Sequence, residues 1–236
     1  MNKKVIIYGY TTIGTKIASI LFDKGYEILV VDDEESLLEN AKKDGFNTYQ
    51  SNLLNDDDLL ELGINKNIDS LFCVTNSNKY NLFVTLSARN LSKRLKIITI
   101  SKTKSEAKKL QIAGATKVLN PNELAAFRIY RYMSKPLMLK VLDDILFSKS
   151  DLNIFEIHID ENSLLKNQFL KEMTIHKDYN ILLIGIMDKE LGDKFIFNTK
   201  GINHKIDVGD VLVVVGKNID LENFSNYINR IENDAI

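Results

Sequence analysis

Two glycines near the N-terminus bound the segment whose residue spacing best matches a binding function. Gly9–Gly14 follows the apolar run Val5–Tyr8 and precedes a helical pattern. In a dinucleotide-binding turn, G-x-G-x-x-G, the first glycine makes the tight turn, the middle one admits the pyrophosphate and the third lets helix and strand approach. The middle position here is Thr11. The pattern predicts a nucleotide-binding turn in which this β-branched side chain either contacts a phosphate or holds the pyrophosphate away.

An acidic residue follows at the position where such folds bind ribose. Asp32 comes directly after the apolar end of the run Glu27–Val31, and Asp33 beside it is the second candidate. A carboxylate there accepts hydrogen bonds from ribose hydroxyls. Two interpretations remain open: the N-terminal part binds a nucleotide, or it keeps the shape of a nucleotide-binding domain without the ligand.

Residues that could catalyse a reaction do not converge in the sequence. A dehydrogenase needs an acid or base near its nicotinamide, but His158, His176 and His204 all lie in the second half of the chain. Cys73 lies inside the apolar run Leu71–Thr75, as a core residue does. The sequence therefore favours a protein that is not an enzyme, with an NAD-dependent oxidoreductase as the weaker alternative.

Two acidic runs could suggest divalent-ion sites, Asp32–Glu35 and Asp56–Asp58. Both lie at the starts of predicted helices, where carboxylates cap the first turn and favour the helix dipole. We therefore expect no metal site.

Composition excludes several classes of protein. The 236 residues carry 31 Lys and Arg against 32 Asp and Glu, a net charge of −1, so we expect no nucleic-acid partner. A single cysteine excludes an internal disulfide. The longest apolar run, Ile181–Met187, is too short to cross a membrane, and the N-terminus lacks a secretory pattern. We expect a cytoplasmic chain whose membrane partner lies outside it.

The first half alternates apolar runs with helical patterns and predicts a six-stranded α/β domain. Its fold class is a Rossmann-like, doubly wound parallel sheet, with an expected strand order of 3-2-1-4-5-6. Glycines end several of the helical patterns. The expected strands are 5–8, 27–31, 46–50, 70–75, 96–100 and 117–119.

Two proline-punctuated helices follow, over 122–135 and 137–147, and then a smaller α+β lobe with a helix expected over 164–174. We expect domains at 1–121, 122–150 and 151–236. The first of the two helices carries apolar residues on more than one face, so it must be buried on several sides. Either a second copy of the chain covers it or the C-terminal lobe folds back over it. The expected dimer-interface residues are Phe127, Ile129, Tyr130 and Met133.

These segments together resemble the RCK domain, the regulator of potassium conductance, over nearly the whole chain. The similarity rests on the glycine turn, on V30-V-D-D-E34, on the A113-G-A115 passage leading to P121-N-E-L124, and on I206-D-V-G-D-V-L-V-V-V-G216. It implies crossover helices exchanged in a dimer, an octameric ring of four dimers, and control of a potassium channel or uptake transporter at the inner face of the membrane.

The resemblance also implies an adenine nucleotide, ADP, ATP or NAD(H), in a cleft at the ends of the first four strands. Matched to this sequence, the cleft consists of Gly9, Tyr10, Thr11, Thr12, Ile13, Gly14, Asp32, Asp33, Asn52, Leu53, Thr75 and Asn76.

The sequence departs from the family pattern at several positions. ATP- and ADP-responsive regulators usually have glycine and arginine where this chain has Thr11 and Thr12. Calcium-gated members have acids after the fourth strand, where this chain reads T75-N-S-N-K79. The degenerate turn is most similar to the cytosolic domain of a two-helix potassium channel. A nucleotide-sensing adaptor of a non-potassium transporter remains the alternative with the same fold.

Overall fold

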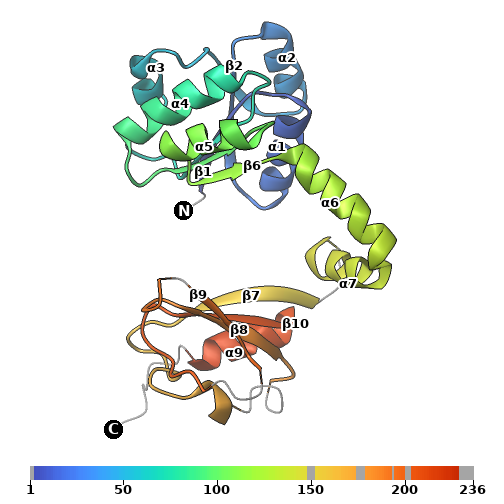
Figure 1. The fold of residues 1–236 in the computed structure, drawn as a ribbon. Helices are drawn as coiled ribbons and strands as arrows, with labels where there is room; N and C mark the ends of the chain where they lie inside the picture. The colour runs from blue at the N-terminus through green and yellow to red at the C-terminus, as the bar shows by residue number, and fades with distance from the viewer. Residues whose placement is uncertain (1–2, 148–151, 174–178, 193, 200–202, 229–236) are drawn as a thin grey trace. The chain divides into compact units, whose positions relative to one another are not determined.

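The computed structural model describes residues 3–147, 152–173, 179–192, 194–199 and 203–228. Contacts divide the chain into two compact units, Met1–Tyr130 and Arg131–Ile236 (Figure 1). Within the described residues no helix has the length and apolar character needed to cross a membrane.

The N-terminal unit is built on a six-stranded parallel sheet in the order β3-β2-β1-β4-β5-β6, which confirms the predicted doubly wound topology. Every neighbouring pair is parallel, so all six strands end at one edge of the sheet. The strands are β1 (Lys4–Tyr8), β2 (Glu27–Asp32), β3 (Asn47–Gln50), β4 (Ser70–Cys73), β5 (Lys96–Ile100) and β6 (Lys117–Leu119).

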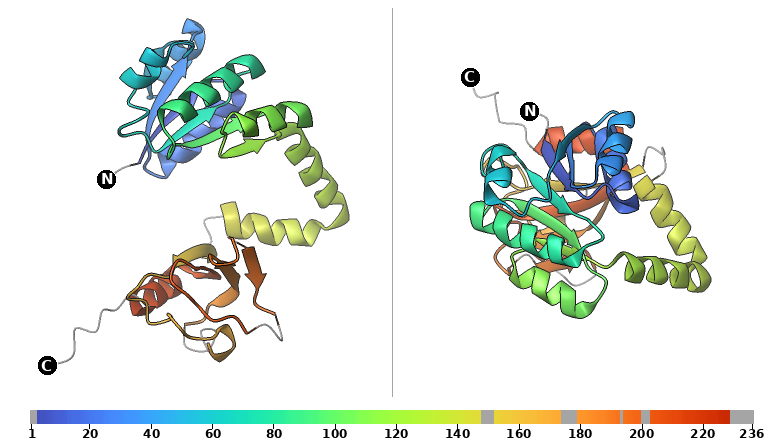
Figure 2. Two further views of the ribbon diagram at one scale, coloured as in Figure 1. Left: turned by 60° about the vertical axis from the view of Figure 1, so that its left-hand side comes forward. Right: turned by 90° about the horizontal axis from the view of Figure 1, so that it is seen from above.

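Helices cover both faces of this sheet (Figure 2). Side chains alternate along β1, so that Ile6 and Tyr8 enter one buried cluster while Val5 and Ile7 enter the other. A sheet covered on both faces needs apolar residues at every position, which explains the unbroken run in the sequence. The helices are α1 (Thr12–Asp23), α2 (Glu35–Lys43), α3 (Asp56–Glu61), α4 (Asn78–Leu91) and α5 (Lys104–Ile112).

Polar side chains cap the starts of four of these helices. Thr11, Asn55, Ser77 and Thr103 each accept a hydrogen bond from a backbone N–H in the first turn. Thr103 forms a complete capping box with Glu106. Because the predicted acidic run Asp56–Asp58 fills the first turn of α3, it acts there as a helix-dipole partner.

Two helices follow the sheet, α6 (Pro121–Ser134) and α7 (Pro136–Phe147). A proline occupies the first position of each, where its missing N–H costs no helical hydrogen bond. No residue of α6 is buried, although the helix carries several large apolar side chains.

The C-terminal unit contains a four-stranded antiparallel sheet in the order β7-β10-β8-β9. Its strands are β7 (Leu152–His158), β8 (Leu182–Asp188), β9 (Lys194–Phe197) and β10 (Val211–Lys217), and α9 (Asn218–Ile228) follows the last strand. Leu221, Phe224 and Ile228 of α9 enter one buried cluster with side chains of the sheet, among them Leu212 and Val214. This unit is the predicted smaller α+β lobe.

The expected helix over 164–174 is wrong across its described residues. The chain forms turns there, with only a short 3₁₀ segment, η1 (Leu170–Glu172). Asn167 has a left-handed backbone with φ of 68°, and the segment pairs with residues 204–206 through a bridge between Phe169 and Lys205. Long-range backbone pairing therefore outweighs the local helical pattern.

Candidate functional site

The glycine turn between β1 and α1 is fixed by steric contacts of the backbone. Gly9 has φ of +105°, and a Cβ added to it would lie 2.6 Å from the backbone nitrogen of Thr75. A Cβ on Gly14 would lie 2.0 Å from the carbonyl oxygen of Gly9. Any side chain at either position collides with main-chain atoms, so the fold itself requires both glycines.

Thr11, at the middle position of the turn, uses its hydroxyl within the protein. The hydroxyl donates to the carbonyl of Val74 at 3.0 Å and accepts from the N–H of Gly14 at 3.4 Å. A threonine hydroxyl has one proton, so this arrangement leaves no donor for a phosphate and one lone pair for a further contact. Thr11 thus caps α1 and ties the turn to the end of β4.

Asp32 is buried at the end of β2 and holds the same turn from the other side. One carboxylate oxygen accepts from the N–H of Tyr10 at 2.8 Å and the other from the N–H of Glu34 at 3.1 Å. Burial raises the pKa of Asp32 above its usual value, and the two backbone N–H donors oppose this shift. Each oxygen keeps a lone pair that a ribose hydroxyl could use, while the side chain of Asp33 is exposed.

The end of β3 has a fixed, strained backbone. Leu53 has φ of 52° although its side chain is completely buried. Such a conformation costs about 1–3 kcal/mol and persists only where the surroundings enforce it. The Tyr8 hydroxyl donates to the carbonyl of Asn52 at 2.7 Å, and the Leu53 N–H donates to the Ser51 hydroxyl at 2.8 Å. Leu53 therefore offers only backbone atoms to a ligand, while Asn52 is exposed.

The end of β4 is held by a residue that sequence reasoning missed. Asn81 of α4 is fully buried, and its oxygen accepts from both the N–H and the hydroxyl of Thr75, at 3.1 and 2.8 Å. Its amide nitrogen donates to the Thr75 carbonyl at 3.0 Å. The only sequence signal was a polar residue at a helix position that faces the sheet. Asn76, beside this anchored Thr75, is exposed.

The strand order brings these four segments to one edge. β1 lies between β2 and β4, and the direction of strand addition reverses there. In open α/β sheets this reversal creates the crevice in which ligands bind. Not every predicted site residue presents its side chain to solvent. Tyr10 is buried, with its hydroxyl donating to Asp44 at 2.6 Å, and Ile13 packs against a buried cluster, whereas Thr12 is exposed.

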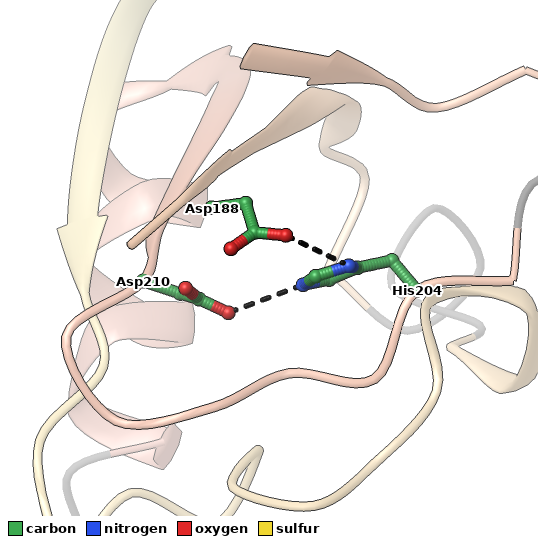
Figure 3. A group of neighbouring side chains, drawn as sticks. All are labelled: Asp188, His204 and Asp210. Atoms are coloured by element: carbon green, nitrogen blue, oxygen red, sulfur yellow. Dashed lines mark hydrogen bonds and ion pairs between the residues drawn. The ribbon is translucent and has the colours of Figure 1, made fainter. Parts of the chain in front are cut away.

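A second cluster of titratable side chains lies in the C-terminal unit (Figure 3). The ring of His204 lies between two buried carboxylates, with Nδ1 3.5 Å from Asp188 and Nε2 3.2 Å from Asp210. Sequence reasoning missed this pairing and treated the histidines as isolated. His158 is exposed, and His176 lies outside the described residues.

One nitrogen of His204 and one carboxylate oxygen from each of Asp188 and Asp210 lie within 4.8 Å of one another, a spacing that could hold a metal ion. Each carboxylate also faces a different ring nitrogen of His204. The carboxylates also accept from backbone N–H groups, those of Leu191, Lys189 and Asp207.

Comparison with known families assigns both units. Residues 5–121 match the TrkA-N domain and residues 154–229 match the TrkA-C domain. The chain therefore belongs to the TrkA-N and TrkA-C domain family, which confirms the predicted RCK membership.

Similar proteins include channels and uptake proteins. Potassium channel protein 1 of Methanocaldococcus jannaschii is 26% identical over 233 residues, covering 98% of this chain and 68% of the relative. A Trk system potassium uptake protein TrkA homolog of Pyrococcus abyssi is 25% identical over 198 residues, covering 79% of this chain and 82% of the relative.

Solved structures share the fold. The GsuK RCK domain superposes with a TM-score of 0.50 at 17% identity, covering 96% of this chain and 46% of that one. The GsuK channel bound to NAD superposes with a TM-score of 0.51 at 17% identity, covering 96% of this chain and 38% of that one. This chain thus spans less than half of each GsuK chain.

Proposed function

We propose that this chain is the ligand-responsive regulatory part of a potassium channel or potassium uptake transporter, and that a nucleotide bound at the carboxyl-terminal edge of the parallel sheet changes the geometry of a dimer. The observation that carries the proposal is the anchored edge itself. Asp32, Leu53 and Thr75 are held in place at the point where the strand order reverses, in a chain whose relatives are potassium channel and Trk proteins.

The residues fit the ribose and the negative charge of an adenine nucleotide, but they fit its pyrophosphate less well. Asp32 and the exposed Asp33 have lone pairs for ribose hydroxyls, and the turn over Gly9–Gly14 leads into the N-terminus of α1, where anions are favoured. The Thr11 side chain occupies part of the space that a glycine at this position would leave for the pyrophosphate. NAD(H), ADP and ATP are the candidate ligands, and the structural similarity to the GsuK channel bound to NAD supports the first of them.

The proposal of a dimer rests on the exposed apolar side chains of α6. Phe127, Ile129, Tyr130 and Met133 are between 54% and 83% exposed. The pairs 127/130, 130/133 and 129/133 are each three or four residues apart, so the four side chains form one broad apolar band around α6. A second copy of the chain that supplied its own α6 and α7 would bury this band. We place the dimer-forming connector at 122–150, between lobes at 1–121 and 151–236.

Thermal unfolding in the presence of ligands tests the nucleotide site. A ligand present at 100 times its dissociation constant stabilises the folded state by about 2.7 kcal/mol. ADP, ATP, NAD⁺ and NADH should be compared with buffer, and with Asp32→Ala as the site variant. We expect at least one of them to raise the melting temperature of the natural chain by a few degrees and to act more weakly on the variant. No shift with any nucleotide would contradict the ligand response.

The dimer requires a separate measurement. Phe127→Asp together with Tyr130→Asp should halve the mass found by sedimentation equilibrium, because two charges would enter the apolar contact. A double substitution at Lys42 and Lys43, exposed on α2, is the control and should leave the mass unchanged. An unaltered mass of the aspartate variant would exclude α6 as the dimer contact.

A further inference from the structure

We propose that a cationic groove at the amino-terminal edge of the parallel sheet binds a phosphate-bearing anion. The groove has a volume of about 610 Å³ and lies between the loops that lead into β4 and β5. The register pairs Ser70 with Lys96 at the start of these strands, so the groove lies at the edge opposite to the glycine turn. It is therefore separate from the proposed nucleotide site and independent of it.

The groove concentrates positive charge in a chain that is nearly neutral. Lys66, Lys93, Arg94 and Lys96 line it, together with one acid, Asp69. This gives a formal excess of three positive charges, against −1 for the whole chain. Ion pairs between described residues involve none of the four cations. The Asp69 carboxylate accepts from the N–H of Lys4 at 2.7 Å.

A fifth cation holds one wall of the groove in shape. The guanidinium of Arg89, on α4, uses all five of its N–H donors on nearby oxygens. Nε donates to the Gly114 carbonyl at 2.8 Å. The two terminal nitrogens donate to the carbonyls of Ser92, Lys93 and Leu95 and to the Thr116 hydroxyl, at 2.7–3.1 Å. Hydrogen bonds from Arg89 thus hold the turn that presents Lys93 and Arg94.

Helix capping does not account for this arrangement. Cations after a helix C-terminus stabilise its dipole, and Lys93 and Arg94 do follow α4. Lys66, however, comes from the loop after α3, and Lys96 is the first residue of β5. Cations from three elements converge on one concave surface whose backbone is already fixed. Phosphate matches it because its several anionic oxygens can accept from Lys and Arg together.

Two sources offer this chemistry, the headgroup of an acidic phospholipid and a soluble polyphosphate. The full chain should be mixed with vesicles of phosphatidylcholine alone, with vesicles of phosphatidylcholine and phosphatidylglycerol in equal parts, and with inorganic tripolyphosphate. Cosedimentation measures vesicle binding and titration calorimetry measures tripolyphosphate binding. We expect binding to the acidic vesicles or to tripolyphosphate, and which of the two binds identifies the source.

Substitutions locate the binding. Lys93→Gln with Arg94→Gln should weaken it roughly thirtyfold, because each cation near an anionic surface contributes about a fivefold increase in affinity. Lys93→Arg with Arg94→Lys keeps both charges and should retain binding. Lys42→Gln with Lys43→Gln removes an equal charge from the end of α2 and should have a small effect. Failure of both probes to bind, or equal losses in the two glutamine pairs, would overturn the proposal, and neither result bears on the nucleotide shifts.

Discussion

At the carboxyl-terminal edge of the parallel sheet, side chains mainly accept hydrogen bonds from backbone N–H groups, whereas at the amino-terminal edge one side chain donates to backbone carbonyls. Asp32 and Asn81 anchor the first edge, and Arg89 anchors the second. Acids surround the first edge, from Asp32 to Glu35, and cations line the groove at the second. Hydrogen bonds within the protein hold both edges, but the side chains differ: carboxylates at the first edge, cations at the second.

The largest expected change in stability comes from a substitution that disrupts the carboxyl-terminal edge. Gly14→Ala should lower the free energy of unfolding by about 4 kcal/mol, since the added Cβ lies 2.0 Å from the Gly9 carbonyl oxygen and backbone must move. Gly25→Ala is the matched control at the opposite edge, because its Cβ meets no atom within 4 Å. It should cost about 1 kcal/mol through its φ of +79° alone. Urea unfolding measures both, and equal losses would contradict the steric argument.

Next in size is the loss of the anchor at the amino-terminal edge. Arg89→Met keeps much of the apolar stem but removes five donors, so we expect a loss of about 3 kcal/mol in unfolding free energy. Arg89→Lys keeps the charge without the planar fork and should lose less. Arg94→Gln, whose side chain lines the groove, should be nearly neutral in stability. If Arg89→Met proved as stable as Arg94→Gln, the five hydrogen bonds would not order the edge.

A smaller change sharpens the comparison through Thr11. Thr11→Gly should raise nucleotide affinity about tenfold, or 1.4 kcal/mol, because it opens the pyrophosphate position. Replacement of a threonine cap by glycine costs only a few tenths of a kcal/mol in helix stability. Thr11→Ser keeps both hydroxyl contacts and should bind as the natural chain does. Titration calorimetry with NAD⁺ and ADP checks this, and equal affinities of all three chains would show that Thr11 is no obstacle.

The smallest expected effect concerns the ionisation of Asp32. Burial holds its pKa above the ordinary value of 3.8, so the folded state favours the protonated form. The stability that this gives is present below the unfolded pKa and is lost as pH rises through the folded pKa. The natural chain should therefore lose stability relative to Asp32→Asn as pH rises through that interval, by less than about 1 kcal/mol because two N–H donors oppose the shift. Urea unfolding at several pH values measures the difference in unfolding free energy between the two chains. A difference that did not change with pH would contradict the raised pKa of Asp32.

The fold was predictable because its signals are local and repeated. Apolar runs such as Ile6–Tyr8 and helix ends at Gly25 and Gly45 recur through six units, and handedness leaves few topologies to choose from. The same local reasoning failed at 164–174, where Asn167 donates its N–H to the carbonyl of Ile206. A helical pattern carries no information about a distant backbone partner.

The candidate site was predictable as a set of segments but not as a set of contacts. Strand ends could be placed at one edge from the order of elements, which put Asp32 and Thr75 near the turn. The roles of Asn81, Arg89 and His204 depend on partners up to 27 positions away in sequence, most of them backbone atoms of other loops. Residue type alone could not distinguish Arg89, whose donors are all used, from Arg94 in the groove beside it.

The collisions at Gly9 and Gly14 have an evolutionary consequence. Natural selection for folding alone would preserve both glycines, whether or not a nucleotide ever binds, since any replacement strikes main-chain atoms. The Thr11 side chain forms its hydrogen bonds through its hydroxyl, with the Val74 carbonyl and the Gly14 N–H, so this position tolerates substitution better than the two glycines. Under the proposed nucleotide function, a single substitution at position 11 would therefore change access of the ligand while both glycines, and with them the fold, are kept.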